Sequence, residues 1–429
     1  MRIKNKIKKN ILIDVAPLSK SLREIHDYSG YQFLSPTALP LVKACEKIEL
    51  SADELRLTFF LKENLRWNNG QKVFAQDYHR ALVEYLKDSH LRFRGYLWSI
   101  EKALEFCNQK AKANEIGIET QSENCLKIQL RRPNRFLIDV LSMPNFSPLH
   151  KSDETLVCGP YYSDHKALKL KRNKYFSFQS NKNTSFQVVD EIQYHLPSLS
   201  DPYGIKSFEN EELDLTCDTL FPFSKVSSLK SRNDFYKSFS GIMMVLVPVR
   251  GSDFFSKQFR QFLFQRINRD QISKALDSQL WPRKSCSEIF GLGPAPNMIR
   301  PANAPAPTSK AIRIGYEDFF PNRKVIEAIA AQLSTFGFAV ELIQEEYGKR
   351  DQKVDYRLEL RQCPFKSDYP LYFQAARSDC FSEDQSSWKA FASSLFEYQK
   401  SNTLSAAHSC VISAIRRRSS SSTISIVRL

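Results

Sequence analysis

Between residues 55 and 88 the pattern of apolar positions changes from a strand period to a helix period. Every second residue is apolar at the start, as on the buried face of a strand: Leu55, Leu57, Phe59 and Leu61. The turn residues Asn68-Asn69-Gly70 follow. The next apolar residues recur at helical spacing and form one stripe: Tyr78, Ala81, Leu82, Tyr85 and Leu86. The pattern predicts a strand, a turn and an amphipathic helix, with Asp77 in the first helical turn, where an anion is favoured.

Residues 116–151 repeat the strand pattern and then change to a short helix. A turn at Ser122-Glu123-Asn124 precedes an alternating apolar series: Leu126, Ile128 and Leu130. Pro133 then precedes an apolar segment over 136–141. This part of the chain is expected to form two strands, a short helix and a loop.

A third patterned region lies beyond a proline-rich connector at 294–307. Residues 312–316 and 338–342 are predicted strands, and the apolar stripe over 325–336 predicts a helix between them that ends at Gly337. A strand, a helix and a strand in this order indicate a parallel pair. The sheet in this region is therefore expected to be α/β.

Length and charge limit the classes of protein that the chain can represent. With 429 residues, of which 42% are apolar and 12% aromatic, two or three packed domains are expected. The net charge of +15 would suit a nucleic-acid binder, but nine of the excess positive charges lie in residues 1–10 and 411–429. The remaining body is only modestly basic and has no basic-aromatic stripe. A dedicated nucleic-acid binder is therefore not expected.

The chain lacks the common signatures of metal, cofactor and catalytic sites. Its nine cysteines form no C-x-x-C pair, and its seven histidines are scattered. There is no G-x-S-x-G, no P-loop and no dinucleotide fingerprint, because Pro294 follows Gly291-Leu292-Gly293 where a helix would have to begin. The sequence predicts no metal, no cofactor and no catalytic residues.

The segment 55–88 resembles the signature of the solute-binding proteins of oligopeptide and dipeptide ABC importers, the bacterial extracellular solute-binding proteins of family 5. In that family a strand ending Thr-Phe-x-Leu-Arg passes through a Trp-x-x-Gly turn into a Thr-Ala-x-Asp-Val helix start. The matching residues are Thr58, Phe59, Leu61, Lys62, Trp67, Asn69, Gly70, Val73, Ala75, Asp77 and Tyr78. Three later segments are also similar to family motifs: Cys158-Gly159-Pro160-Tyr161, Val189-Asp190-Glu191-Ile192 and the helix 260–269.

The resemblance covers roughly residues 44–400, and the chain is shortened relative to the family at both ends. It implies an α/β, two-lobed, periplasmic-binding-protein-like type II fold with an inserted α+β subdomain. The expected division is an incomplete lobe I at 1–45 and 157–240, the inserted subdomain at 46–156, and lobe II at 241–410. Residues 411–429 form a basic, serine-rich segment that is expected to be disordered.

The resemblance also implies a ligand site after a lobe II strand. Family members have Gly-Trp-x-x-Asp-Tyr at the cleft between the lobes, and in oligopeptide binders that aspartate meets the peptide α-ammonium. The matching residues are Asp368 and Tyr369, with Phe365 at the tryptophan and Pro364 at the glycine. Arg361 is a candidate partner for a peptide carboxylate. The alternative interpretation is a solvated loop aspartate and a surface arginine.

The resemblance implies the substrate-binding component of an ABC importer, which captures oligopeptides or dipeptides by hinge closure and is not an enzyme. Its expected partners are the peptide and the membrane permease subunits, and it is expected to be a monomer. Family members lie in the periplasm or cell envelope, but MRIKNKIKKN is not followed by a signal-peptide apolar region. A cytoplasmic ligand-sensing regulator and a truncated, non-functional paralogue are the alternatives.

Overall fold

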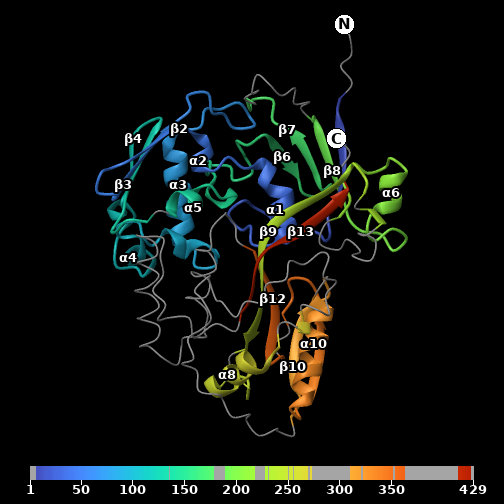
Figure 1. Cartoon of the computed structure of the whole chain (residues 1–429). Helices are drawn as coiled ribbons and strands as arrows, with labels where there is room; N and C mark the ends of the chain where they lie inside the picture. Colours follow the sequence, from blue (N-terminus) through green and yellow to red (C-terminus); the bar gives the residue numbers. More distant parts are fainter. Residues whose placement is uncertain are drawn as a thin grey trace. The chain divides into compact units, whose positions relative to one another are not determined.

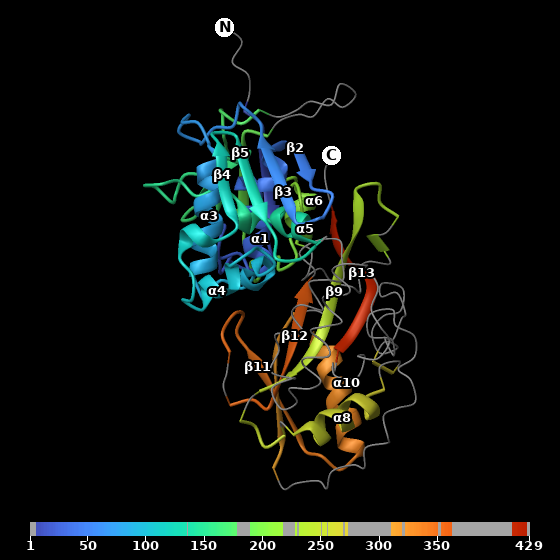
Figure 2. The same cartoon turned by 90° about the vertical axis from the view of Figure 1, so that its left-hand side faces the viewer.

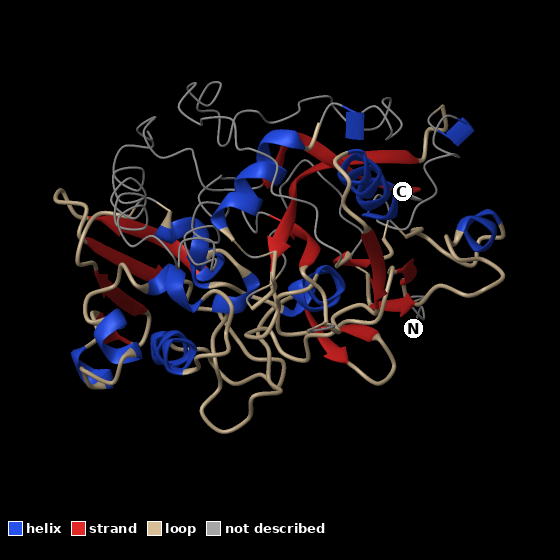
Figure 3. Ribbon diagram, turned by 90° about the horizontal axis from the view of Figure 1, so that it is seen from below, coloured by secondary structure: helices blue, strands red, loops and turns tan. Residues whose placement is uncertain are grey.

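The computed structural model describes residues 6–134, 136–177, 189–217, 228–229, 231–249, 251–254, 256–268, 271–272, 310–319, 322–350, 353–362 and 414–426. The chain divides into two compact units, residues 1–217 and residues 218–427 (Figure 1). Each unit contains both helices and strands. Figure 3 shows the two kinds of element in different colours. Among the described residues, no helix combines the length and the apolar character needed to cross a membrane.

The first unit contains a four-stranded mixed sheet that joins the beginning of the chain to its middle. The strand order is β1 (Lys8–Leu12), β8 (Glu191–His195), β7 (Lys169–Arg172) and β6 (Tyr161–Asp164). Strand β1 runs parallel to β8, and the other pairs are antiparallel. Helix α1 (Tyr28–Leu34) supplies Phe33, which is fully buried with its ring edge-on to Tyr194 at 5.3 Å between centroids. These contacts make the first core of the unit.

A second sheet in the same unit is antiparallel throughout (Figure 2). Its order is β2 (Cys45–Leu50), β3 (Arg56–Leu61), β5 (Cys125–Gln129) and β4 (Ile118–Ser122). The predicted alternation is confirmed, since Leu57, Phe59 and Leu61 are buried. Helix α3 (Ala75–Lys87) packs against β4 and β5 and buries the whole predicted stripe, from Tyr78 to Leu86.

Short helices cover the rest of the first unit. They are α2 (Leu41–Ala44), α4 (Ala103–Cys107), α5 (Leu137–Leu141) and α6 (Ile205–Glu209), with single 3-10 turns at Ser35–Thr37, Arg94–Leu97, Ala113–Glu115 and Pro144–Phe146. The short helix predicted at 136–141 corresponds to α5. It buries Leu137, Val140 and Leu141.

The second unit is built on a five-stranded mixed sheet. The order is β11 (Val340–Glu345), β10 (Ile312–Glu317), β12 (Tyr356–Gln362), β9 (Phe235–Pro248) and β13 (Ala414–Ile426). Strand β10 runs parallel to both β11 and β12, whereas β9 is antiparallel to β12 and β13. Helix α10 (Asn322–Thr335) connects β10 to β11 and packs on both strands (Figure 1). The predicted strand-helix-strand unit with a parallel pair is confirmed.

Aromatic side chains form the described core of the second unit. Helix α8 (Lys257–Arg266) is capped by Ser256, whose Oγ accepts a hydrogen bond from the Phe259 N–H at 3.2 Å. Phe259 packs edge-on to Phe338 at 5.5 Å, and Phe262 lies 5.6 Å from the same ring. Phe338 is therefore a core residue in the connection before β11, although the sequence predicts that the strand begins there.

The structure differs from the prediction of a disordered tail at 411–429. Residues Ala414–Ile426 form strand β13, which pairs with β9 and has an irregular register between Arg416 and Ser420. Low-complexity composition indicates disorder only when the segment finds no partner, and here the edge of β9 supplies backbone partners. Strand β9 also spans residue 241, where the sequence places the start of lobe II. The division into lobes and an inserted subdomain stays a prediction.

Candidate functional site

The predicted ligand site begins at the carboxyl end of β12. Arg361 is the next-to-last residue of this strand, and its backbone lies opposite Met243 of β9. Phe365, Asp368 and Tyr369 lie outside the described residues. The described part of the chain therefore locates the strand that leads into the predicted site and not the site itself.

Strand β12 has unequal pairing on its two sides. Its antiparallel ladder with β9 continues to Gln362, whereas its parallel ladder with β10 ends at Leu358. Within the described residues, the last part of β12 therefore pairs with a strand on one side only. An extended chain can bind such an edge through backbone hydrogen bonds, as an added strand does.

The carboxyl ends of the parallel strands β10, β11 and β12 lie at one edge of the sheet. In open α/β sheets this edge is where ligands bind, because the loops that follow the strands gather there. Arg361 is the only residue of the predicted site among those that the structure describes, and it lies near the carboxyl end of β12. The position of the ligand site after β12 stays a prediction.

A buried ion pair braces this edge. The carboxylate of Glu345 in β11 accepts two hydrogen bonds from the guanidinium of Arg357 in β12, at 2.7 and 2.9 Å. Strand β10 lies between β11 and β12, so the side chains of Glu345 and Arg357 meet over β10 at Gly315. A Cβ atom on Gly315 would lie only 2.7 Å from Glu345 Oε2. The side chain of Glu345 is 3% exposed and that of Arg357 is 13% exposed. A residue without a side chain at position 315 is what allows the pair to form.

In the first unit, the turn at 67–71, which is part of the family-like signature, hydrogen-bonds to the segment that connects the second sheet to β6. We call this segment the returning segment. The Asn68 N–H donates to the Val157 carbonyl at 2.8 Å, and the Val157 N–H donates to Asn68 Oδ1 at 3.2 Å. The buried Trp67 ring packs edge-on to His150 at 5.3 Å. Gly70 has a φ of +93° and packs under Tyr175, so its position suits glycine.

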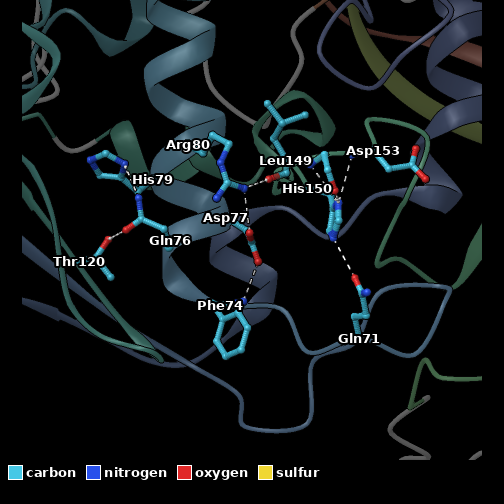
Figure 4. A network of polar contacts seen from close by, with 11 residues as sticks. Gln71, Phe74, Gln76, Asp77, His79, Arg80, Thr120, Leu149, His150 and Asp153 are labelled. Atoms are coloured by element: carbon cyan, nitrogen blue, oxygen red, sulfur yellow. Dashed lines mark hydrogen bonds and ion pairs between the residues drawn. The ribbon is translucent and has the colours of Figure 1, made fainter.

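Asp77 is at the centre of a polar network between α3 and the returning segment (Figure 4). Its Oδ2 accepts from the Phe74 N–H at 2.9 Å and its Oδ1 accepts from Arg80 Nη1 at 2.9 Å. Arg80 Nη1 also donates to the Leu149 carbonyl at 2.6 Å, and the Leu149 N–H donates to the Asp77 carbonyl at 3.1 Å. One carboxylate thus caps the helix and orients the arginine that holds Leu149.

The neighbouring His150 closes the turn that follows Leu149 (Figure 4). Its Nδ1 accepts from the Asp153 N–H at 3.2 Å, so the proton is on Nε2, which donates to Gln71 Oε1 at 2.9 Å. Like the Asp77 network, this arrangement joins two segments of backbone. Both networks are structural.

The segment Cys158–Tyr161 is also structural. A Cβ on Gly159 would lie 2.3 Å from the Thr37 carbonyl oxygen, so only glycine fits without backbone movement. The buried side chain of Asn173 donates to the Gly159 carbonyl at 3.0 Å. Burial raises the pKa of the Cys158 thiol, and the negative charge of Asp77 adds to this effect, so the thiol is an unreactive packing group.

The chain is similar to known proteins in both sequence and fold. The profile of the bacterial extracellular solute-binding proteins, family 5, matches residues 42–394. The dipeptide-binding protein of Lactococcus lactis is 28% identical over 199 residues, which are 42% of this chain and 35% of that protein. The dipeptide-binding protein DppE of Bacillus subtilis is 24% identical over 176 residues, 33% of this chain and 32% of that protein. These matches span about a third of each relative's length.

Solved structures extend the likeness of fold over nearly the whole chain. The OppA of Haemophilus influenzae, in complex with the peptide RPPGFSPFR, has a TM-score of 0.74 and 16% identity, and the match covers 99% of this chain and 95% of that one. The Listeria monocytogenes OppA bound to peptide has a TM-score of 0.71, with 16% identity and the same coverage. At these identities the likeness concerns the fold alone. The predicted α/β fold of the type II periplasmic-binding-protein class is confirmed.

Proposed function

The chain belongs to the bacterial extracellular solute-binding proteins of family 5, and from this membership we propose that it is the substrate-binding component of an ABC importer that captures oligopeptides or dipeptides. The observation that carries the proposal is the family match over residues 42–394, which extends through both compact units. The names of the sequence relatives, dipeptide-binding and oligopeptide-binding proteins, support a peptide as the solute.

The proposed peptide site follows the carboxyl end of β12. Asp368 would bind the α-ammonium of the peptide, Arg361 its carboxylate, and Phe365 and Tyr369 would line the site. The one-sided pairing of β12 beyond Leu358 supports a peptide held in an extended conformation, because backbone groups at such an edge bind any sequence. Recognition through the backbone suits a carrier of varied peptides.

The proposal includes the expected partners and location. The membrane permease subunits of the importer would receive the peptide, and the protein would act in the periplasm or cell envelope, as the description of the family as extracellular supports. Hinge closure would be the only conformational step, with no bond made or broken in the solute.

The test is thermal unfolding of the purified chain with and without a mixed pool of di- to pentapeptides. A ligand that binds only the folded state adds about 2.7 kcal/mol when its free concentration is about 100 times its Kd, so the midpoint must rise. We expect a rise for the unaltered chain and none for Asp368→Ala.

The matched control is Asp253→Ala. Asp253 is a well-exposed aspartate of the same unit, paired only with the exposed Lys310 among the described residues, so this variant is expected to keep the full peptide-dependent rise. A cooperative transition that no peptide shifts would contradict the proposal. A rise that persists in Asp368→Ala would leave a peptide receptor but place the ammonium site elsewhere.

A further inference from the structure

The loop between β8 and α6, residues 196–203, carries two leucine side chains in contact with solvent. Leu196 is 43% exposed, and the relative exposure of Leu199 is 106%, which means that water reaches its whole side chain. Three other large apolar side chains of the described residues are exposed, and each is alone in its segment: Leu18, Tyr31 and Leu50. Pro202 is also exposed. We call residues 196–203 the leucine loop.

Hydrogen bonds inside the leucine loop hold Leu199 in this position. Its two neighbours, Ser198 and Ser200, have their hydroxyl oxygens 3.2 Å apart. Ser198 Oγ also accepts from the Asp201 N–H at 3.1 Å, and the Asp201 carboxylate accepts from the Ser207 N–H of α6 at 2.8 Å. The polar residues on either side of Leu199 are therefore tied to one another and to the helix. A leucine on such a loop is preorganised, so little conformational entropy is lost when a partner buries it.

Both ends of the leucine loop are anchored on the first sheet. Where the loop begins, the His195 carbonyl accepts from the Ile13 N–H at 3.0 Å. Where it ends, Gly204 has a φ of +70°, and a Cβ there would lie 2.7 Å from Leu12 Cδ2. The loop thus leaves the carboxyl end of β8 and returns to the carboxyl end of β1, which is parallel to β8. Ligands of α/β proteins bind at the carboxyl ends of parallel strands.

The surface that follows the leucine loop is acidic, although the chain as a whole is basic. Residues 196–213 contain four acidic residues and one basic residue, whereas the whole chain has a net charge of +15. Three of the four acidic residues are exposed at the end of α6 and directly after it: Glu209, Glu211 and Glu212. Such a surface is repelled by the anionic headgroups of a membrane and is complementary to a basic protein surface.

The shape of the leucine loop favours a folded protein over a peptide as its partner. Sites for small ligands are concave and enclose most of the ligand. Leu199 is the opposite, a side chain that projects from the surface, so it is buried only when the partner supplies the pocket. Apolar anchors at protein interfaces fill pockets of this kind. A peptide of a few residues has no such pocket.

We propose that the leucine loop docks the protein on the membrane permease subunits of its importer, with Leu199 inserted into an apolar pocket that basic side chains surround. The inference rests on the proposed function, in which these subunits receive the peptide. Position supports this partner, because a subunit that receives the solute has to approach the carboxyl ends of parallel strands, where α/β proteins bind their ligands.

The experiment compares peptide uptake with peptide binding. Uptake of a radiolabelled peptide from the pool is measured in cells of the species that makes the protein, with its gene deleted and then restored as the unaltered chain or as a variant. Binding is the peptide-dependent rise of the unfolding midpoint of the purified chain. Leu199→Ser is expected to lower the gene-dependent uptake about tenfold or more, as the loss of an interface anchor does, and to leave the rise unchanged.

Matched variants separate docking from general effects on the first unit. Leu50→Ser also removes an exposed leucine, in β2, and is expected to keep both uptake and binding. Glu212→Lys reverses one charge beside the leucine loop and is expected to lower uptake about threefold or more without changing the rise. Glu63→Lys makes the same reversal at an exposed position elsewhere in the unit and is expected to keep full uptake.

Photocross-linking identifies the docking partner. A photoreactive p-benzoylphenylalanine replaces Leu199 in one full-length chain and Leu50 in another, and each chain is irradiated with membranes of the same cells. Mass spectrometry is expected to identify a permease subunit of an ABC importer in the product from position 199. No such product is expected from position 50.

Four results would overturn the inference. Unchanged uptake with Leu199→Ser would show that the leucine loop does not dock, and loss of the peptide-dependent rise in this variant would place the loop in the peptide site. Flotation of the unaltered chain, but not of Leu199→Ser, with phosphatidylglycerol vesicles would identify a membrane contact. A dimer in sedimentation that Leu199→Ser abolishes would identify a second copy as the partner. Absence of any rise or of gene-dependent uptake for the unaltered chain would instead overturn the proposed function, and the docking with it.

Discussion

Replacing Asp77 by alanine is expected to lower the free energy of unfolding of the residue 1–217 unit by about 2–4 kcal/mol. The loss has two parts. The hydrogen bond to the Phe74 N–H caps α3 and contributes about 1 kcal/mol, as helix caps do. The contact with Arg80 joins a carboxylate that is 9% exposed to a guanidinium that is 27% exposed, and a hydrogen bond between such charged groups contributes about 1.5–3 kcal/mol.

A double-mutant cycle separates these two parts. Asp77→Asn keeps an acceptor for the Phe74 N–H and removes the charge, so it is expected to cost less than Asp77→Ala. Arg80→Ala removes the hydrogen bond to Leu149 as well as the contact with Asp77. In the double variant the two losses overlap, and a coupling of about 1–2 kcal/mol is expected for residues in one network.

The assay is urea unfolding followed by tryptophan fluorescence. The chain has two compact units, so a single transition cannot be assumed. Trp67 and Trp98 belong to the first unit, and replacing Trp281 and Trp388 by phenylalanine leaves fluorescence that reports on this unit alone. The slope of the transition should stay constant while its midpoint moves. Additive losses, with a coupling within about 0.3 kcal/mol of zero, would refute the network described for Asp77.

Three further outcomes are expected. Gly315→Ala should destabilise the second unit by about 3 kcal/mol, because the added Cβ separates the buried pair of Glu345 with Arg357; an unchanged urea midpoint would contradict this. Burial raises the pKa of the Cys45 thiol to about 12, so little reactive thiolate is present at pH 8. Alkylation of Cys45 at pH 8, measured by mass spectrometry, should be about 100-fold slower in the native chain than in the urea-unfolded chain. Equal rates would show that the native chain has an accessible thiolate. Burial raises the pKa of the Glu317 carboxyl in the folded chain above its usual value of 4.5. As the pH rises above 4.5, this carboxyl therefore loses its proton more readily in the unfolded chain than in the folded chain, and the free energy of unfolding falls. Glu317→Gln should remove that fall from the pH dependence of the unfolding midpoint, and a curve identical to that of the unaltered chain would be inconsistent with the burial of the carboxyl.

Much of the local structure follows from patterns that the sequence states directly. Alternation over 55–61 predicts β3, and the stripe from Tyr78 to Leu86 predicts α3, because a period of two or 3.6 residues reports which face of an element is buried. Gly337 correctly marks the end of α10. The spacing of the signature residues was also sufficient to identify the family, since it depends on residue types and intervals and not on contacts.

Other features could be known only from the tertiary structure. Glu317 and Glu359 are far apart in sequence and become neighbours because β10 and β12 pair in one register, which no local pattern encodes. Gly315 is isolated in the sequence, and its role becomes visible only when Glu345 and Arg357 are brought to either side of it. The basic, serine-rich segment at 414–426 has the composition of a disordered tail, but the edge of β9 pairs with it. Periodicity determined which faces are buried, whereas strand register decided which charges meet.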